Sequence, residues 1–499
     1  MTRTNPLLHM SAIFVAAASV SGCAMLGNPV GPDYRPPSFE APSEWLSQAP
    51  LAGVAPTGWD AFGDPLLVDL VARASANNRS LAAAAADVAR ARALRRAAIG
   101  ELWPSANASA AQSDIHNSEN GLIPFGALPG GATQANVLDL ELTAIWNLDL
   151  SGAIWRSVEA ASARTEALDA AQMALALSIA SETAETYIML RGREGQLALA
   201  ERSVEIRART LELAQERFDV GDASRFDVER ALAARQRAEA RVPSLRAQIA
   251  RLRLALGLLT GENPQAAARR LLGTPDNLAA RDLPLNDAPL SVLARRPDVR
   301  QAERTLAATT ASIGVAEGRL YPSLTLFGAL GAEARNLDDL FNAESRTSLL
   351  GPSLRLPIFG RGRLRALVRS EEAAAQAALA RFDHVVMSAL ADADAALATA
   401  GEAGRTLAAL DNAVEANMRA QELARLRYES GEDSLLPLLE SDRELIDVET
   451  ERLDARTNLL LANVRLVRAL GGPREAVVAH TEAGSANELR GRSTPDAKR

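Results

Sequence analysis

Histidine and cysteine, the side chains that most often supply metal ligands, nucleophiles and general bases, are rare in this chain of 499 residues. The single cysteine is Cys23, and the four histidines are scattered, at His9, His116, His384 and His480. No His/Cys/carboxylate group has metal-ligand spacing, and no G-x-S-x-G, P-loop or dinucleotide-binding fingerprint stands between a strand and a helix. Asp392 and Asp394 fit an exposed helix face better than an acid pair. We therefore expect no enzyme activity, no cofactor and no bound metal.

Cys23 is placed for a different chemistry, at the end of a short apolar N-terminal segment. Residues 12–20 (AIFVAAASV) are too few for a membrane-spanning helix, and the segment closes with the letters VSGC. This ending resembles a bacterial lipobox, in which the cysteine receives lipid and becomes the first mature residue; an ordinary signal peptide with a chance cysteine is the alternative. We expect residues 1–22 to be a lipoprotein signal peptide and Cys23 to be the lipid attachment site. Ala24 stands where an Asp would favour the inner membrane, so the anchor is expected in the outer membrane.

Acidic residues alternate with apolar ones in a second segment, from Val137 to Leu150. One face carries mainly leucines, and the other carries Asp139, Glu141 and Asp149. Strict alternation with a period of two is typical of a half-buried strand, and this run exceeds the usual soluble strand of about 5–6 residues. The pattern favours a membrane-barrel strand with lipid outside and water inside, so that the three carboxylates face the lumen. A strand of a soluble sandwich is the alternative.

Helices must position this strand, because helical patterns dominate the rest of the chain. Apolar spacing near 3.6 without proline predicts a helix over about 152–218, roughly 100 Å long at 1.5 Å per residue. A return helix is expected over about 225–256, with Pro243 as a candidate kink. The helical residues 66–99 break between two asparagines, and Ser80 is expected to cap the helix that follows.

Two hexamers, GELWPS at 100–105 and GRLYPS at 318–323, mark the same helix-to-strand junction twice. The glycine is expected to take the left-handed conformation that ends a helix, and the proline enforces an extended chain. The similarity extends upstream, where Asp298 aligns with Ser80 as a helix cap, and downstream to glycine turns after both long helices. The chain is therefore predicted to be a duplication of helix, strand, strand, long helix, tip turn and helix.

This organisation divides the chain into six parts. The predicted ranges are a signal peptide (1–22), an extended N-terminal segment (23–63), a first repeat (64–262) with strands near 102–113 and 137–150, a linker (263–288), a second repeat (289–472) with strands near 320–331 and 346–358, and a polar tail expected to be disordered (473–499). In each repeat the two shorter helical stretches together match the long helix in length. Stacked end to end, they would form a cylinder wall about 100 Å tall.

Four amphipathic strands per chain cannot close a membrane barrel, since the smallest barrels have about eight. Open strand edges are not viable in lipid. The chain is therefore expected to form a symmetric oligomer that shares one barrel, and three copies would supply twelve strands. The net charge of −8 and the pI near 5.4 give no basic signal for nucleic acid.

Five segments carry a resemblance to a known family: GPDYRPP (31–37), WDAFGDPLLVDLV (59–71), RRPDVRQAE (295–303), GRLYPSLTLFGALG (318–331) and VRALGG (467–472). The chain resembles the TolC-like outer-membrane factor family, in the lipoprotein branch of resistance-nodulation-division efflux systems. The resemblance implies a mostly α fold, a homotrimer with a twelve-stranded outer-membrane β-barrel on a periplasmic α-barrel of antiparallel coiled-coil helices. It implies a passive exit duct for small molecules in a Gram-negative bacterium, docked to a periplasmic adaptor and an inner-membrane transporter. A duct for protein secretion, or a lipid-anchored coiled-coil adaptor without a pore, are the alternatives.

The resemblance also assigns roles to residues at the tips of the helices. Gly221 and Gly431 map onto the turns that contact the adaptor. Glu440 falls where relatives often have an Asp whose ring narrows the periplasmic aperture; a solvated helix face is the alternative. Asp227 and Tyr428 align with a pair that hydrogen-bonds in some relatives, which suggests a closed-state latch. Pro437 replaces a position that is often polar or acidic, so a second acidic ring is not expected there.

Overall fold

The computed structural model describes residues 29–39, 42, 44–46, 58–116, 118, 134–274, 276–280 and 288–472. The predictions made for Cys23, for the signal peptide and for the C-terminal tail fall outside these residues. The chain forms two compact units, and each takes residues from both halves of the sequence. The first unit comprises residues 1–37, 88–168 and 302–382, and the second comprises 38–87, 169–301 and 383–499.

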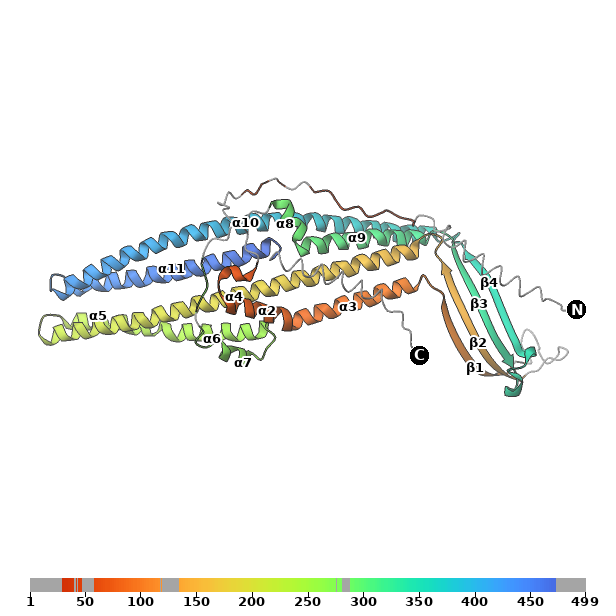
Figure 1. The fold of residues 1–499 in the computed structure, drawn as a ribbon, viewed down its shortest axis with the longest axis horizontal. Coiled ribbons are helices and arrows are strands. Elements are labelled where there is room, and N and C mark those ends of the chain that lie inside the picture. Colours follow the sequence, from red (N-terminus) through yellow and green to blue (C-terminus); the bar gives the residue numbers. More distant parts are fainter. Residues whose placement is uncertain are drawn as a thin grey trace. The chain divides into compact units, whose positions relative to one another are not determined.

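The first unit holds one antiparallel sheet in the order β1-β2-β3-β4 (Figure 1). Its strands are β1 (Ser105–His116), β2 (Gln134–Leu148), β3 (Ser323–Ala334) and β4 (Arg346–Arg355). Each strand begins within three residues of its predicted position. Because β2 pairs with both β1 and β3, this sheet joins the two halves of the sequence.

The register of the strands sorts the side chains into two faces. Leu142 lies opposite Leu330, and Leu324 lies opposite both Leu148 and Leu354, so the leucines of three strands share one face. Many of them are exposed, including Leu350 at 81%. The opposite face carries Asp139, which lies across from Glu333, together with Glu141 and several threonines. The predicted alternation is therefore present, with an apolar face open to the surroundings.

Helices make up most of the remaining described residues. Their bounds are α2 (Pro65–Asn77), α3 (Arg79–Gly100), α4 (Ala153–Asp219), α5 (Arg225–Glu239), α6 (Arg241–Leu259), α7 (Pro264–Arg270), α8 (Pro289–Arg295), α9 (Pro297–Gly318), α10 (Arg361–Glu429) and α11 (Leu435–Ala469). In the part of the chain that the structure describes, no helix has an apolar stretch of membrane-spanning length.

The core of the second unit forms where the apolar stripe of α2 meets α4, α6 and α11. Leu67, Leu70, Val71 and Ala74 of α2 are buried at the i, i+3, i+4 and i+7 spacing of one helix face. They pack in one cluster with residues such as Tyr187, Leu256 and Leu460. Short apolar stripes on several helices thus close one shared core.

Asn78 joins two helices end to end in the second unit. Its side-chain Oδ1 accepts hydrogen bonds from the backbone N–H of Ser80 at 2.9 Å and Leu81 at 3.4 Å, which caps α3. Its Nδ2 donates to the carbonyl oxygen of Leu259, the last residue of α6, at 2.9 Å. The prediction that Ser80 is the cap is wrong by two residues, because Asn78 is the residue with an extended backbone before the helix.

Arg296 makes the equivalent junction in the second half of the sequence. Its Nη1 donates to the carbonyl oxygen of Ala469, the last residue of α11, at 2.9 Å. Its Nε and Nη2 donate to the two carboxylate oxygens of Asp298, at 3.0 and 2.6 Å, in the first turn of α9. Asp298 therefore lies inside the helix and is not the predicted cap. Burial alone would raise the pKa of Asp298, but the paired guanidinium holds it below its ordinary value.

Glycines end four helices with the same pair of hydrogen bonds. The amide of Asp222 donates to the carbonyl of Arg217 at 2.8 Å, and that of Gly221 to Phe218 at 3.0 Å, which is a Schellman motif. The same pattern recurs at the ends of α6, α10 and α11, with positive φ angles at Gly261, Gly431 and Gly471. Gly100 and Gly318 are not among the glycines with positive φ, so the left-handed conformation predicted for the hexamers is wrong. Gly318 is instead a close approach, since an added Cβ would lie 2.3 Å from that of Ala153.

Pro243 breaks the return helix at the place that its ring dictates. The regular helix is interrupted at Ala240, between α5, which ends at Glu239, and α6, which begins at Arg241, although Ala240 itself keeps helical dihedral angles. A proline ring clashes with the carbonyl four residues earlier, and that residue is Glu239. The predicted kink is therefore confirmed, as a boundary between two helices.

We expect Asn78→Ala to destabilise the protein by about 1–2 kcal/mol through loss of the cap, with a further loss because the Leu259 carbonyl is left unpaired. Thermal unfolding followed by circular dichroism measures the effect. Asn78→Asp is the matched control, because it keeps the cap acceptor but cannot donate to Leu259. Its melting midpoint should lie between that of the wild type and that of Asn78→Ala. An alanine variant that melts with the wild type would show that the junction contributes nothing.

Candidate functional site

The two turns that follow the long helices α4 and α10 have the same backbone conformation, and each contains a local ion pair. In the first turn Arg217 pairs with Asp222 at 2.7 Å, and in the second Arg427 pairs with Asp433 at 3.0 Å. Gly221 and Gly431 are both exposed and have φ angles of 86° and 79°. No atom lies within 4 Å of a Cβ built on Gly221, so backbone conformation alone demands glycine there.

Arg217 also ties the first turn to the second. Its Nη1 donates to the backbone oxygen of Tyr428 at 2.8 Å, and its guanidinium carbon lies 4.7 Å from the centre of the Tyr428 ring. A cation over an aromatic face adds to the hydrogen bond. Hydrogen bonding to Asp222 raises the pKa of Arg217 further, so the tie keeps its charge at every physiological pH. The sequence analysis did not predict this contact.

The predicted latch between Asp227 and Tyr428 is not formed in this structure. The Asp227 carboxylate accepts hydrogen bonds from the Ser224 hydroxyl at 2.7 Å and the Ser224 amide at 3.2 Å, which makes it half of a capping box for α5. The Tyr428 side chain is buried beside Leu435 and Leu438, and its hydroxyl has no hydrogen-bond partner among the described residues. Local capping therefore outcompetes the long-range pair.

Glu440 lies in the second turn of α11 with its side chain exposed. Leu435 and Leu438, which precede it, face the buried cluster around Tyr428, so Glu440 points away from that cluster. A single chain does not test whether three copies of Glu440 form a ring, and this role stays a prediction. Pro437 is also exposed in the first turn, where a proline is tolerated.

Asp442, which sequence reasoning missed, is a buried carboxylate between α11, α10 and α4. Only 4% of it is exposed; one oxygen accepts from Nε2 of Gln421 at 2.9 Å, and the other has no partner among the residues that the structure describes. Burial raises the pKa of Asp442, although Gln421 and the charge of Arg207 oppose the shift. Desolvation also lowers the pKa of Arg207, which is the cation of this cluster. A charge change at this position would act directly on helix packing.

The three acidic residues predicted for a lumen divide into two environments. Asp139 and Glu141 lie on β2, on the face opposite the leucines. Asp149 lies beyond the end of β2, and its carboxylate accepts from the amides of Ile154 at 2.8 Å and Trp155 at 3.0 Å. It thereby caps the N-terminus of α4, where negative charge is favoured. Within the described ranges no cluster of His, Cys, Asp and Glu is arranged to hold a metal ion.

Comparisons with known proteins agree on one family. The sequence model described as "Outer membrane efflux protein" matches residues 70–262 and 288–472. The chain is 30% identical to the probable efflux pump outer membrane protein SepC of Pseudomonas putida, over 93% of this chain and 96% of that protein. It is 28% identical to the solvent efflux pump outer membrane protein SrpC of Pseudomonas putida, over 92% and 97%. Among solved structures, the outer-membrane channel OprN matches with a TM-score of 0.81 and 31% identity, over 89% of this chain and 99% of that chain.

The buried Asp442 generates a pH prediction that Asp442→Asn isolates. A raised pKa means that the packed state prefers the protonated carboxyl, so its contribution is favourable at low pH and is lost as pH rises through the raised pKa. We therefore expect the melting midpoint of the wild type to fall relative to that of Asp442→Asn between pH 4 and pH 8. Asp447→Asn, at a half-exposed pair with Arg443, is the control and should change little over this range. Parallel pH profiles for wild type and Asp442→Asn would contradict the prediction.

Proposed function

Because this chain belongs to the outer membrane efflux protein family, we propose that it forms the outer-membrane exit duct of a tripartite efflux pump. In this proposal the duct is passive and conducts small molecules from the periplasm to the exterior. It docks to a periplasmic adaptor and to an inner-membrane resistance-nodulation-division transporter.

The sheet is the observation that carries the proposal. In the described part of the chain β1 and β4 each pair with one neighbour, which leaves two open edges. One face of the sheet exposes leucines, among them Leu350 at 81% and Leu354 at 67%. Open edges and exposed leucines are both costly in a monomer, and lipid together with strand pairing between copies would satisfy both. Three copies would supply twelve strands, so we propose a homotrimer.

The substrates are proposed to be small organic compounds. Relatives are named for toluene, solvent and antibiotic efflux pumps, and those names describe those proteins. Their similarity over nearly the whole chain supports the same class of cargo here. Protein secretion remains the alternative, with no observation in this structure that favours it.

We propose that Gly221 and Gly431 mark the turns that meet the adaptor. Both turns are exposed, and each has rigid backbone geometry set by a Schellman motif. Exposed apolar side chains accompany the first turn, with Val220 79% and Phe226 66% accessible. Exposed apolar groups at a rigid turn are suited to contact with another protein. Glu440, on α11 close to the second turn, is proposed to line the aperture.

A lipid anchor at Cys23 is supported by how tightly the chain is held just after it. Arg156, whose side chain is 4% exposed, donates to the backbone oxygens of Val30 at 3.0 Å and Gly31 at 3.2 Å, and to Asp33 at 2.7 Å. The amide of Val30 donates to the carbonyl of Ser151, between β2 and α4. The few residues between Cys23 and Pro29 span at most about 20 Å, so an acyl chain on Cys23 would enter lipid near this end of the sheet.

Deleting the gene tests the proposed function. We expect the deletion to increase susceptibility to several chemically unrelated toxic compounds, and the purified protein to form channels in planar bilayers. A protein that opens no channel, or a deletion strain with unchanged susceptibility whose secretome loses proteins, would contradict the proposal. Cys23→Ser should leave channel formation intact while reducing membrane attachment, which separates the anchor from the duct.

The tie made by Arg217 generates a prediction about the closed duct. Arg217→Gln removes the contact with Tyr428, so the two turns can separate, and the resting single-channel conductance should rise. Arg427→Gln is the matched control from the other repeat; it removes a pair within one turn and should have a smaller effect. Tyr428→Phe should leave conductance unchanged, because the hydroxyl has no partner among the described residues. An increase with Tyr428→Phe would restore the latch hypothesis.

The polar face of the sheet generates a prediction about ion preference. The double variant Asp139→Arg/Glu141→Arg should lower the preference for cations, because both carboxylates would face the lumen. Reversal potentials in asymmetric KCl measure this preference. Asp149 is left unchanged because it caps α4, and Asp338→Arg, in the turn between β3 and β4, is the control. An unchanged reversal potential would place these carboxylates away from the ion path.

A further inference from the structure

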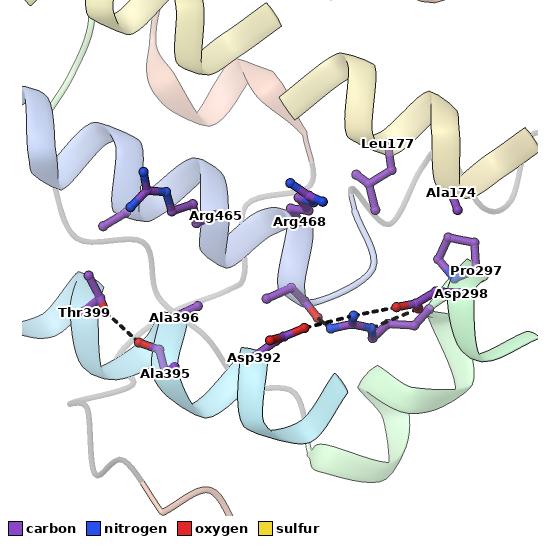
Figure 2. Close-up of a pocket in the computed structure, with 13 residues that line it drawn as sticks. Ala174, Leu177, Pro297, Asp298, Asp392, Ala395, Ala396, Thr399, Arg465 and Arg468 are labelled. Carbon is purple, nitrogen blue, oxygen red and sulfur yellow. Dashed lines mark hydrogen bonds and ion pairs between the residues drawn. The ribbon is translucent and has the colours of Figure 1, made fainter. Parts of the chain in front are cut away.

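A pocket of about 560 Å³ opens in the second unit between α4, α10, α11 and the first turn of α9 (Figure 2). Alanines from three helices account for much of its wall: Ala174, Ala395, Ala396, Ala462 and Ala469. Since these side chains end at Cβ, the surrounding helices leave space that no residue fills. Leu177 adds a larger apolar group on the α4 side (Figure 2). The volume lies in the range of small-molecule sites, about 300–1,000 Å³.

The charged residues of the pocket are unequally paired. Asp298 pairs closely with Arg296, at 2.6 Å, whereas Asp392 is 59% exposed and lies 3.6 Å from the same guanidinium, which is a weak pair. Arg465 is 62% exposed, and its Nε is 3.7 Å from Glu185, which is a weak surface pair. Arg468 is exposed, and no carboxylate of the described residues is recorded within ion-pair distance of it. Two exposed guanidinium groups thus border this pocket, against one weakly paired carboxylate, Asp392.

We propose that this pocket binds small organic anions. An apolar body would lie against the alanines and Leu177, and a carboxylate or sulfonate head would accept hydrogen bonds from Arg465 and Arg468. Guanidinium is suited to such heads because it donates two parallel hydrogen bonds to a planar or tetrahedral oxyanion. Strongly hydrated inorganic anions have no apolar body to contact the alanines and Leu177, so they would bind this pocket less tightly.

The position of the two arginines on α11 connects the pocket to the duct, and this step rests on the proposed function. At 3.6 residues per turn, Arg465 lies within about 20° of Glu440 around α11, and Arg468 lies about 80° away. If Glu440 faces the interior, Arg465 faces it too, and the pocket borders that side of the helix. A neighbouring groove along α10 and α11 is acidic, lined by Glu402, Glu451 and Asp454. That groove repels organic anions, whereas the arginines attract them, so the arginine pocket would slow or select anionic cargo.

Isothermal titration calorimetry with naphthalene-2-sulfonate tests the proposal, using the full-length protein in zwitterionic nanodiscs and empty nanodiscs as the blank. We expect saturable binding that weakens as NaCl is raised. Arg465→Gln/Arg468→Gln should weaken it at least tenfold, and Ala395→Phe, which fills the pocket from an exposed position without changing charge, should abolish it. Arg443→Gln, an exposed arginine of the same helix outside the pocket, should bind like the wild type.

Three results would overturn the proposal: no binding by the wild type, equal binding by the arginine double variant, or equal binding by Ala395→Phe. No binding by the wild type is also the result expected if an acidic side chain of a neighbouring copy already fills the pocket. In that case the arginine double variant should form less stable trimers on native gels. Planar-bilayer conductance of the same preparation keeps the two proposals apart. A channel that conducts but does not bind the sulfonate overturns only the anion site, whereas a preparation without conductance contradicts the duct.

Discussion

The second unit depends on a junction that satisfies two helix ends with one side chain. A helix end leaves its last carbonyls and first amides without intrahelical partners, and two ends meeting inside a protein would bury both sets. Asn78 supplies a donor to Leu259 and an acceptor to the start of α3. Arg296 supplies donors to Ala469 and binds the carboxylate at the start of α9. Short helices can therefore follow one another in space beside α4 and α10.

The duplicated junctions solve the same problem with different chemistry. Asparagine carries a donor and an acceptor, so Asn78 alone serves both helices. Arginine has donors only, so Arg296 needs Asp298 as an intermediary inside α9. This requirement leaves a charged pair at the edge of the pocket in Figure 2, where the first repeat has a neutral side chain. The anion site that we propose therefore adjoins the point where the two repeats diverge chemically.

The tips of the long helices combine rigid turns with a contact between them. Each Schellman motif fixes one turn, and Arg217 links the first turn to Tyr428 in the second. If these turns border the aperture, as we propose, opening of the duct would require this discrete tie to break. Asp442 is buried between α11, α10 and α4, and burial raises its pKa, so the packing of these helices is expected to depend on pH. The proposed gate would therefore include side chains that pack between helices, in addition to the predicted role of Glu440.

The sequence by itself determined the elements, because their signals are local. Period-two alternation found β2, spacing near 3.6 found α4, and the shared hexamers revealed the duplication that implies a second long helix, α10. Only the tertiary structure decided which polar groups meet. Ser80 and Asp298 were predicted as helix caps from residue type, but Asn78 and Arg296 make the two junctions, and their partners Leu259 and Ala469 lie far away in the chain. Asp442 and the Arg217 tie were likewise missed, since burial and desolvation arise only when distant helices pack, and no local pattern records that.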